Sequence, residues 1–217
     1  MPPETDRRMD QSHPVVSDPT GGMVCDEIVI FQMEKGERRM ISKKMFDAMK
    51  EQIKNEMESA YIYLSMAAYF HSKNLDGMAH WMRCQVHEET IHAMKFFDHI
   101  INRGGEVVLL DLKQLKLTWK NPLEPWKDAY AHEQFITAKI HNLLKIARKE
   151  NDYTAEPMLA WFVNEQIEEE NNTDKVVRQL EMVGDSKEGL FMLDRELGTR
   201  IFVAGSPFDP AAYNLLQ

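Results

Sequence analysis

Apolar side chains recur at steps of three, four or seven residues through most of this sequence. Such spacing is typical of helices that bury one face and expose the other. Ser42 and Thr154 are suited to cap the starts of two of these helices, and the pair Gly104-Gly105 is suited to end another. The pattern predicts four long helices and a short fifth one, at residues 42–71, 75–102, 122–151, 154–184 and 185–198.

The connection at residues 104–124 is much longer than the others and has no helical period. Its segment VVLLDL indicates extended chain. A connection of this length is unusual within a compact domain and needs a topological reason. A bundle whose second and third helices run in the same direction provides that reason. We therefore predict an all-α fold, namely a four-helix bundle with one long crossover between the second and third helices and a short fifth C-terminal helix.

Both ends of the chain are expected to lie outside this bundle. Residues 1–39 contain four prolines and no sustained period, and we interpret them as a flexible N-terminal extension. Met40 directly precedes the predicted cap, so translation starting at Met40 is an open alternative. Residues 199–217 contain Pro207 and Pro210 and are expected to form an irregular C-terminal tail. The helical domain would then span residues 40–198.

Composition narrows the possible partners. The net charge of -9 disfavours binding to nucleic acid, which depends on Lys and Arg side chains that neutralise phosphates, and suits the binding of cations. The two cysteines, Cys25 and Cys84, cannot form a disulfide framework or a four-thiolate metal site, which indicates a reducing compartment. No segment has the ~18 apolar residues of a membrane span, and no secretory signal is visible. We therefore expect a cytoplasmic protein without membrane or nucleic-acid partners.

Each long helix carries a polar residue in the middle of its apolar face. A single glutamate in such a place usually lies at the edge of the face and is solvated, because a buried unpaired carboxylate costs several kcal/mol. Four helices with the same feature favour convergence on a shared cation. In the first helix the recurring apolar residues are Met49, Ile53, Ala60, Leu64 and Ala67. Glu56 lies between Ile53 and Ala60, on a line that continues through Tyr63 to Ala67. The corresponding residues of the next three helices are Glu89 with His92, Glu133, and Gln166 with Glu169.

These residues resemble the di-iron motif of ferritins. In chain order they form the pattern Glu56, Glu89-x-x-His92, Glu133 and Gln166-x-x-Glu169, one part on each long helix. The segments EETIH, YAHEQFITAKI and NEQIEEE are similar to those of bacterial non-haem ferritins, and the resemblance covers roughly residues 42–197. The resemblance implies that haem is absent, because the haem-containing bacterioferritins have Glu-x-x-His on the fourth helix and a haem-binding methionine at the position of Thr90.

The resemblance also implies a role for each residue of the motif. One iron ion would bind Glu56, Glu89 and His92. Glu89 would bridge to a second iron ion, which Glu133 and Glu169 would also hold. Gln166 would be a weak ligand or a nearby hydrogen-bond donor. The catalytic residues of the implied ferroxidase are then Glu56, Glu89, His92, Glu133 and Glu169.

Two further features of the sequence each allow two interpretations. Tyr63 lies seven residues after Glu56 on the same helix face, so it could hydrogen-bond a ligand or pass an electron, and a tyrosine of the core is the plain alternative. Three glutamates, together with Glu169, match a third iron position of bacterial ferritins, and simple surface charge is the alternative for them. They are Glu88, Glu165 and Glu168.

The function that the resemblance implies is iron storage. The protein would oxidise Fe(II) to Fe(III) with O2 or hydrogen peroxide and deposit ferric mineral inside a homo-oligomeric shell of 24 subunits. The alternative is a di-iron peroxidase or oxidase of the rubrerythrin type that does not store iron. Rubrerythrins carry an added four-cysteine iron domain, which two cysteines cannot build. A helical bundle that only binds a partner would leave the convergent ligands unexplained.

Overall fold

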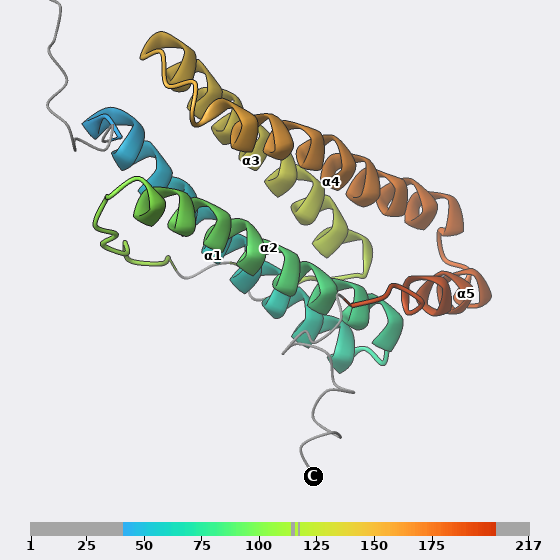
Figure 1. Ribbon diagram of the computed structural model, residues 1–217. Helices are drawn as coiled ribbons and strands as arrows, with labels where there is room; N and C mark the ends of the chain where they lie inside the picture. Colours follow the sequence, from blue (N-terminus) through green and yellow to red (C-terminus); the bar gives the residue numbers. More distant parts are fainter. Residues whose placement is uncertain (1–40, 114–115, 117, 203–217) are drawn as a thin grey trace, which may run out of the picture. The chain divides into compact units, whose positions relative to one another are not determined.

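The computed structural model describes residues 41–113, 116 and 118–202. Its regular elements are all helices, and no strand occurs among the described residues (Figure 1). The predicted N-terminal extension and most of the predicted C-terminal tail lie outside the described residues, so their conformation stays a prediction. The helices are α1 (Lys43–Ser72), α2 (Asp76–Asn102), α3 (Leu123–Lys149), α4 (Glu156–Val183) and α5 (Lys187–Leu197).

The four long helices form two hairpins. Helix α1 packs along α2, α3 packs along α4, and α1 also contacts α3 across the two pairs. The short helix α5 contacts α2 and α4. Described residues of the connection between α2 and α3 contact α1, since Lys113 bonds to Glu58 and Lys116 to Ser65. Helices α2 and α3 run in the same direction (Figure 1). The predicted bundle with a long crossover and a short fifth helix is therefore confirmed.

Local capping explains most of the helix boundaries. The Oγ atom of Ser42 accepts a hydrogen bond from the backbone N–H of Met45 at 3.1 Å, as predicted, and Ser186 caps α5 in the same way. The prediction for Thr154 is wrong. Residue Ala155 occupies the cap position of α4, and its backbone N–H donates to the carbonyl oxygen of Asp152 at 3.1 Å.

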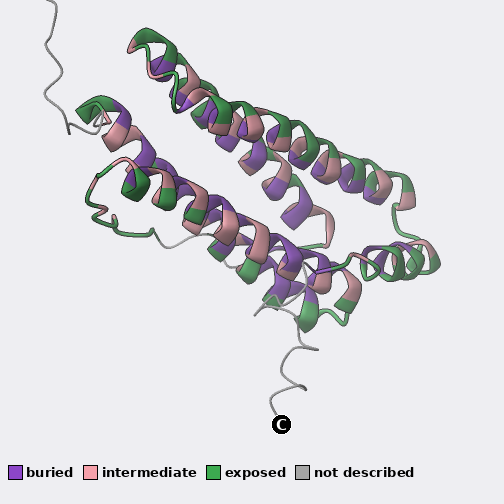
Figure 2. Ribbon diagram, viewed as in Figure 1, coloured by how far each residue is buried: buried purple, intermediate pink, exposed green. Residues whose placement is uncertain are grey.

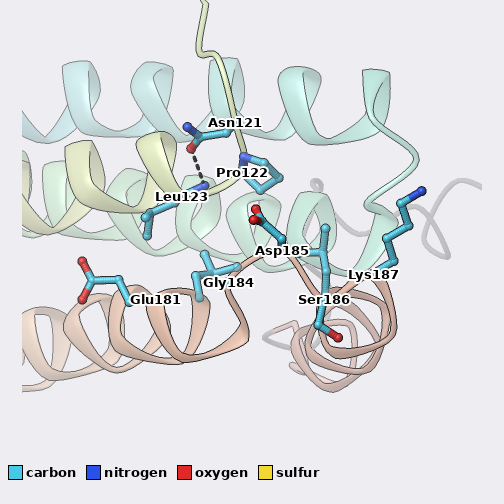
Figure 3. A pocket seen from close by; sticks show the side chains of 10 residues that line it. Asn121, Pro122, Leu123, Glu181, Gly184, Asp185, Ser186 and Lys187 are labelled. Atoms are coloured by element: carbon cyan, nitrogen blue, oxygen red, sulfur yellow. Dashed lines mark hydrogen bonds between the residues drawn. The ribbon is translucent and has the colours of Figure 1, made fainter.

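A pocket of about 520 Å³ lies where α3 begins, α4 ends and α5 begins. At its edge Asn121 accepts a hydrogen bond through Oδ1 from the backbone N–H of Leu123 at 3.1 Å (Figure 3). The same oxygen accepts from the backbone N–H of Glu124, also at 3.1 Å. The side chain of Asn121 thereby satisfies amides that the first turn of α3 leaves without helical partners. None of the described residues that line this pocket belongs to the metal-ligand pattern of the sequence.

The buried side chains form two apolar clusters. One is built around Tyr63, Phe70, Trp81 and Trp126, and the other contains Met49, Ile53, Phe96, Ile140 and Phe162. Figure 2 shows the buried residues as stripes along the inner face of each helix. Within the described part of the chain, no helix is long and apolar enough to cross a membrane.

A set of buried polar residues separates these two clusters along every long helix. We call this set the polar layer. On α1, for example, Glu56 lies between Ile53 of one cluster and Ala60 of the other. The expected inward position of Leu64 is wrong, because that side chain is 46% exposed while the neighbouring Tyr63 is buried. The polar layer consists of Gln52, Glu56, Gln85, Glu89, His92, Glu133, Gln166 and Glu169.

Candidate metal centre

Helices α1 and α2 bring three ligand-type side chains together. Oxygen and nitrogen atoms of Glu56, Glu89 and His92 all lie within 4.8 Å of one another, and all three residues are buried. The spacing of Glu89 and His92 places both on one face of α2, and Nδ1 of His92 is 3.5 Å from Oε2 of Glu89. Two carboxylates and one imidazole at this separation suit a divalent cation such as Fe(II) or Zn(II).

Helices α3 and α4 contribute the rest of the layer. The amide Nε2 of Gln166 donates to Oε2 of Glu133 at 3.0 Å. Tyr63 donates its hydroxyl hydrogen to the other oxygen, Oε1, of Glu133. Glu133 therefore has both oxygens held in place by neutral donors from α1 and α4, which orients it without neutralising its charge.

Glu169 is connected to the α2 ligands through an amide. The Nε2 atom of Gln85 donates to Oε2 of Glu169 at 2.9 Å and lies 3.4 Å from Oε1 of Glu89. A single side chain of α2 thus joins a carboxylate of α2 with one of α4. All six residues of the predicted motif are thus buried in one layer. Among the described residues, Glu56, Glu89 and His92 are the group whose carboxylate and imidazole ligand atoms all lie within 4.8 Å of one another.

The layer carries more carboxylates than its surroundings can keep ionised. Burial, together with the neighbouring carboxylate of Glu89, raises the pKa of Glu56 to about 8. Burial likewise raises the pKa of Glu169 to about 8, with Glu133 adding to the effect. The pKa values of Glu89 and Glu133 lie well above the usual range for the same reason. Without a cation, protons must compensate these charges.

Unused acceptor atoms also fit a metal ion. The oxygens Oε2 of Glu56, Oε1 of Gln85 and Oε1 of Gln166 are buried and have no hydrogen-bond partner among the described residues. Buried oxygens without partners are uncommon because each costs about 1–3 kcal/mol. Oxygens are the donors that hard cations such as Fe(III) prefer. The residues present therefore fit a metal ion bound by carboxylates and one imidazole.

The three glutamates of the suggested third iron position lie at the margin of the layer. Glu88 and Glu165 are half-buried, whereas Glu168 is exposed. Burial raises the pKa of Glu165, and the nearby carboxylates of Glu168 and Glu88 add to this increase. The three side chains are thus close enough to interact, but Glu88 is already engaged by the guanidinium of Arg200.

Several contributors to the layer were not assigned from the sequence. Gln52 donates through Nε2 to Oε1 of Glu56 at 2.8 Å, and it stands four residues before Glu56 just as Gln85 stands four residues before Glu89. This repeated Gln-x-x-x-Glu spacing on α1 and α2 is a signal that could have found both amides. The rings of Trp161 and Phe162 face the ring of His92 edge-on, each with centroids 5.6 Å apart.

Comparison with known proteins identifies close relatives. The family model of the ferritin-like domain matches residues 46–183, a range that contains every residue of the polar layer. The bacterial non-heme ferritin of Staphylococcus aureus (strain MRSA252) is 34% identical over 163 residues, which cover 75% of this chain and 98% of the relative. The protein of the same name from Staphylococcus epidermidis is 35% identical over 163 residues, which again cover 75% of this chain and 98% of the relative.

Solved structures agree with these sequence relatives. An engineered closed form of the Archaeoglobus fulgidus ferritin has a TM-score of 0.74 at 42% identity and covers 75% of this chain and 99% of its own. A structure described as a novel open pore ferritin from the same archaeon has a TM-score of 0.73 at 43% identity. The match covers 74% of this chain and 98% of the archaeal one.

Proposed function

Because this chain belongs to the ferritin family, we propose that it is an iron-storage protein that oxidises Fe(II) in its polar layer. The observation that carries this proposal is the burial of Glu56, Glu89, His92, Glu133 and Glu169 in one layer, with acceptor oxygens left unused. Iron is the substrate of this reaction. Two Fe(II) ions each give up one electron, and O2 or hydrogen peroxide accepts the pair.

The ligand set accounts for the direction of the reaction. Glu56, Glu89 and His92 would bind one ion, and Glu89 would be shared with a second ion held by Glu133 and Glu169. Carboxylate oxygens are hard donors that stabilise Fe(III) more than Fe(II), so they favour oxidation. The hydrogen bonds from Tyr63 and Gln166 would keep Glu133 oriented during this change of charge.

Proton release would accompany iron binding. Glu56 and Glu169 have pKa values of about 8 in the protein, so near neutral pH they hold protons that a bound cation must displace. Gln166 carries no charge, and a neutral ligand holds Fe(III) less strongly than a carboxylate would. This difference would let the oxidised product leave the layer, which suits storage better than a site that keeps its metal.

We further propose how the chain assembles, that it binds no haem, and where in the cell it lies. We infer a homo-oligomeric shell, for which the archaeal relatives described as open and closed forms provide the precedent. Absence of haem is part of the proposal, because Thr90 offers no thioether at the position where bacterioferritins bind haem. A cytoplasmic location follows from the same family assignment.

Sizing the purified full chain with and without Fe(II) in air tests the storage function. Analytical ultracentrifugation should give a large assembly whose sedimentation coefficient rises as ferric mineral accumulates inside it. The matched control is Glu51→Ala, which removes an exposed carboxylate of α1 outside the layer and should load iron like the wild type. A small oligomer that oxidises Fe(II) without gaining mass would favour a non-storage enzyme of the rubrerythrin type instead.

A further inference from the structure

Arg200 follows α5 and lies against α2, directly beside the metal centre. Its Nη2 donates to Oε2 of Glu88 at 2.6 Å, and its guanidinium carbon lies 4.2 Å from the centre of the Trp81 ring. The side chains of Arg200 and Glu88 are only 19% and 29% exposed. Charge-assisted hydrogen bonds of this kind are stronger when they are partly shielded from water. Arg200 is therefore held by an ion pair and by an aromatic ring at the same time.

The backbone of Arg200 is fixed as well. Its carbonyl oxygen is 2.6 Å from Nε2 of His80, which must carry the hydrogen because a carbonyl can only accept. The ring of Phe202 packs edge-on against His80, with centroids 4.9 Å apart. Side-chain and backbone contacts on both sides therefore determine where the guanidinium lies.

Helix α5 is itself anchored at the start of α2. The carboxylate of Asp194 accepts from the backbone N–H groups of Met78 at 2.8 Å and Gly77 at 3.2 Å, which caps α2. Gly77 is required there, because a Cβ atom would approach the carbonyl oxygen of Asp194 to 1.7 Å. The chain that leads to Arg200 is thus fixed to α2 a short distance before it reaches Glu88.

The charge of Arg200 acts on two carboxylates inside the polar layer. Burial raises the pKa of Glu89 and of Glu169, and the carboxylate of Glu88 raises both further, whereas Arg200 opposes the increase at both residues. The nitrogen Nη1 of Arg200 is buried and has no hydrogen-bond partner among the described residues. This nitrogen has therefore lost its contact with water and has no hydrogen bond in its place. The guanidinium is thus partly inserted at the margin of the layer and does not lie only on the surface.

We propose that Arg200 takes the place of a third metal ion by holding Glu88, so that each subunit binds two ions and not three. The inference rests on the proposed iron function and specifies its stoichiometry. An oxygen of Glu88 that accepts from a guanidinium is a poorer ligand, and the positive charge of Arg200 repels a cation approaching the same carboxylate. Without Glu88 the margin of the layer offers only half-buried Glu165 and exposed Glu168, together with Glu169, which the second ion would already use.

Counting bound Fe(II) under anaerobic conditions tests this proposal without relying on oxidation. Equilibrium dialysis followed by elemental analysis should give two ions per subunit for the wild type and three for Arg200→Met. Methionine keeps an apolar stem against Trp81 and offers Fe(II) no oxygen. The double variant Arg200→Met with Glu88→Gln should return to two ions, because Glu88 would be the ligand released. Arg195→Met, an exposed position of α5, should behave like the wild type.

Two results would overturn the proposal. One is an unchanged count of two in a folded Arg200→Met variant, which would mean that Arg200 only fastens the chain to α2. The other needs no change at Arg200: a wild type that binds three ions and loses one in Glu88→Gln would show that the third position is open despite the guanidinium. The proposed function is judged separately, by whether Glu89→Ala abolishes the first two ions.

Discussion

Gln166 has one end of its amide hydrogen-bonded within the polar layer and the other end without a partner among the described residues. Its Nε2 donates to Glu133 at 3.0 Å, while its Oε1 is buried and free to face a cation. A carboxylate at this position could not donate to Glu133 and would add a negative charge to a layer in which burial already raises the pKa of four glutamates. In the proposed function, the neutral amide would limit how strongly the layer holds an oxidised ion.

Replacing Gln166 by Glu changes charge with almost no change of volume. We expect Gln166→Glu to oxidise the first two Fe(II) ions about as fast as the wild type and to retain the Fe(III) product longer, because a further carboxylate stabilises Fe(III). Stopped-flow absorbance of successive iron additions measures both steps. Equally fast recovery of wild type and variant between additions would mean that Gln166 has no part in product release.

At the scale of secondary structure, the bundle holds the layer in place with residues that all lie after Met40. Ser42 caps α1 and also hydrogen-bonds Glu150 at the end of α3, and the first buried core residues are Met45 and Met49. Every helix that the structure describes, and every ligand of the proposed site, is thus formed by residues that follow the predicted N-terminal extension.

A chain that begins at Met40 should therefore assemble and oxidise iron like the full-length protein. The reason is that removing residues 1–39 takes away no contact among the described helices. Sedimentation velocity and the rate of Fe(II) oxidation provide the comparison. An insoluble or monomeric product would show instead that the extension is part of the folded assembly.

The sequence predicted five helices and the one long crossover, because the apolar period and the position of the long connection are local features. It did not determine which side of a helix a neighbour would cover. The helical period of α1 allowed both Leu64 and the adjacent Tyr63 to face inward, and the packing of α1 against its neighbours decides that Tyr63 is buried and Leu64 is exposed. The role of Arg200 could not be predicted, because its ion pair joins residues 112 positions apart. The candidate ligands could be proposed from the sequence because each long helix carries its own part of the motif, and their role as ligands stays a prediction.

At the scale of the whole molecule, the metal-free protein should lose stability as pH rises through the neutral range. In the unfolded chain Glu56 has a pKa near 4.5, and in the folded protein near 8. Below pH 4.5 the group is protonated in both states. Between these values the folded state keeps a proton that the unfolded state has released, so the free energy of unfolding falls with pH. Above about pH 8 this contribution ends.

Thermal or urea unfolding of the metal-free protein at several pH values measures this slope. One such proton corresponds to about 1.4 kcal/mol per pH unit, so Glu56→Gln should have a flatter profile than the wild type by up to that amount. Redox-inert Zn(II) should flatten the wild-type profile as well, because it replaces the protons and stabilises only the folded state. Parallel profiles for wild type and Glu56→Gln would contradict the assignment of the raised pKa to this carboxyl.

The most direct test of the central claim is the rate of oxidation when two Fe(II) per subunit are mixed with wild type, Glu89→Ala and Glu51→Ala in air-saturated buffer. Wild type and Glu51→Ala should oxidise the iron rapidly and at the same rate. Glu89→Ala should be slower by at least about 10–100-fold, the range that follows the loss of groups that merely orient metal ligands, because Glu89 would serve both ions. Oxidation by Glu89→Ala at the wild-type rate would show that the polar layer is not the site of the reaction.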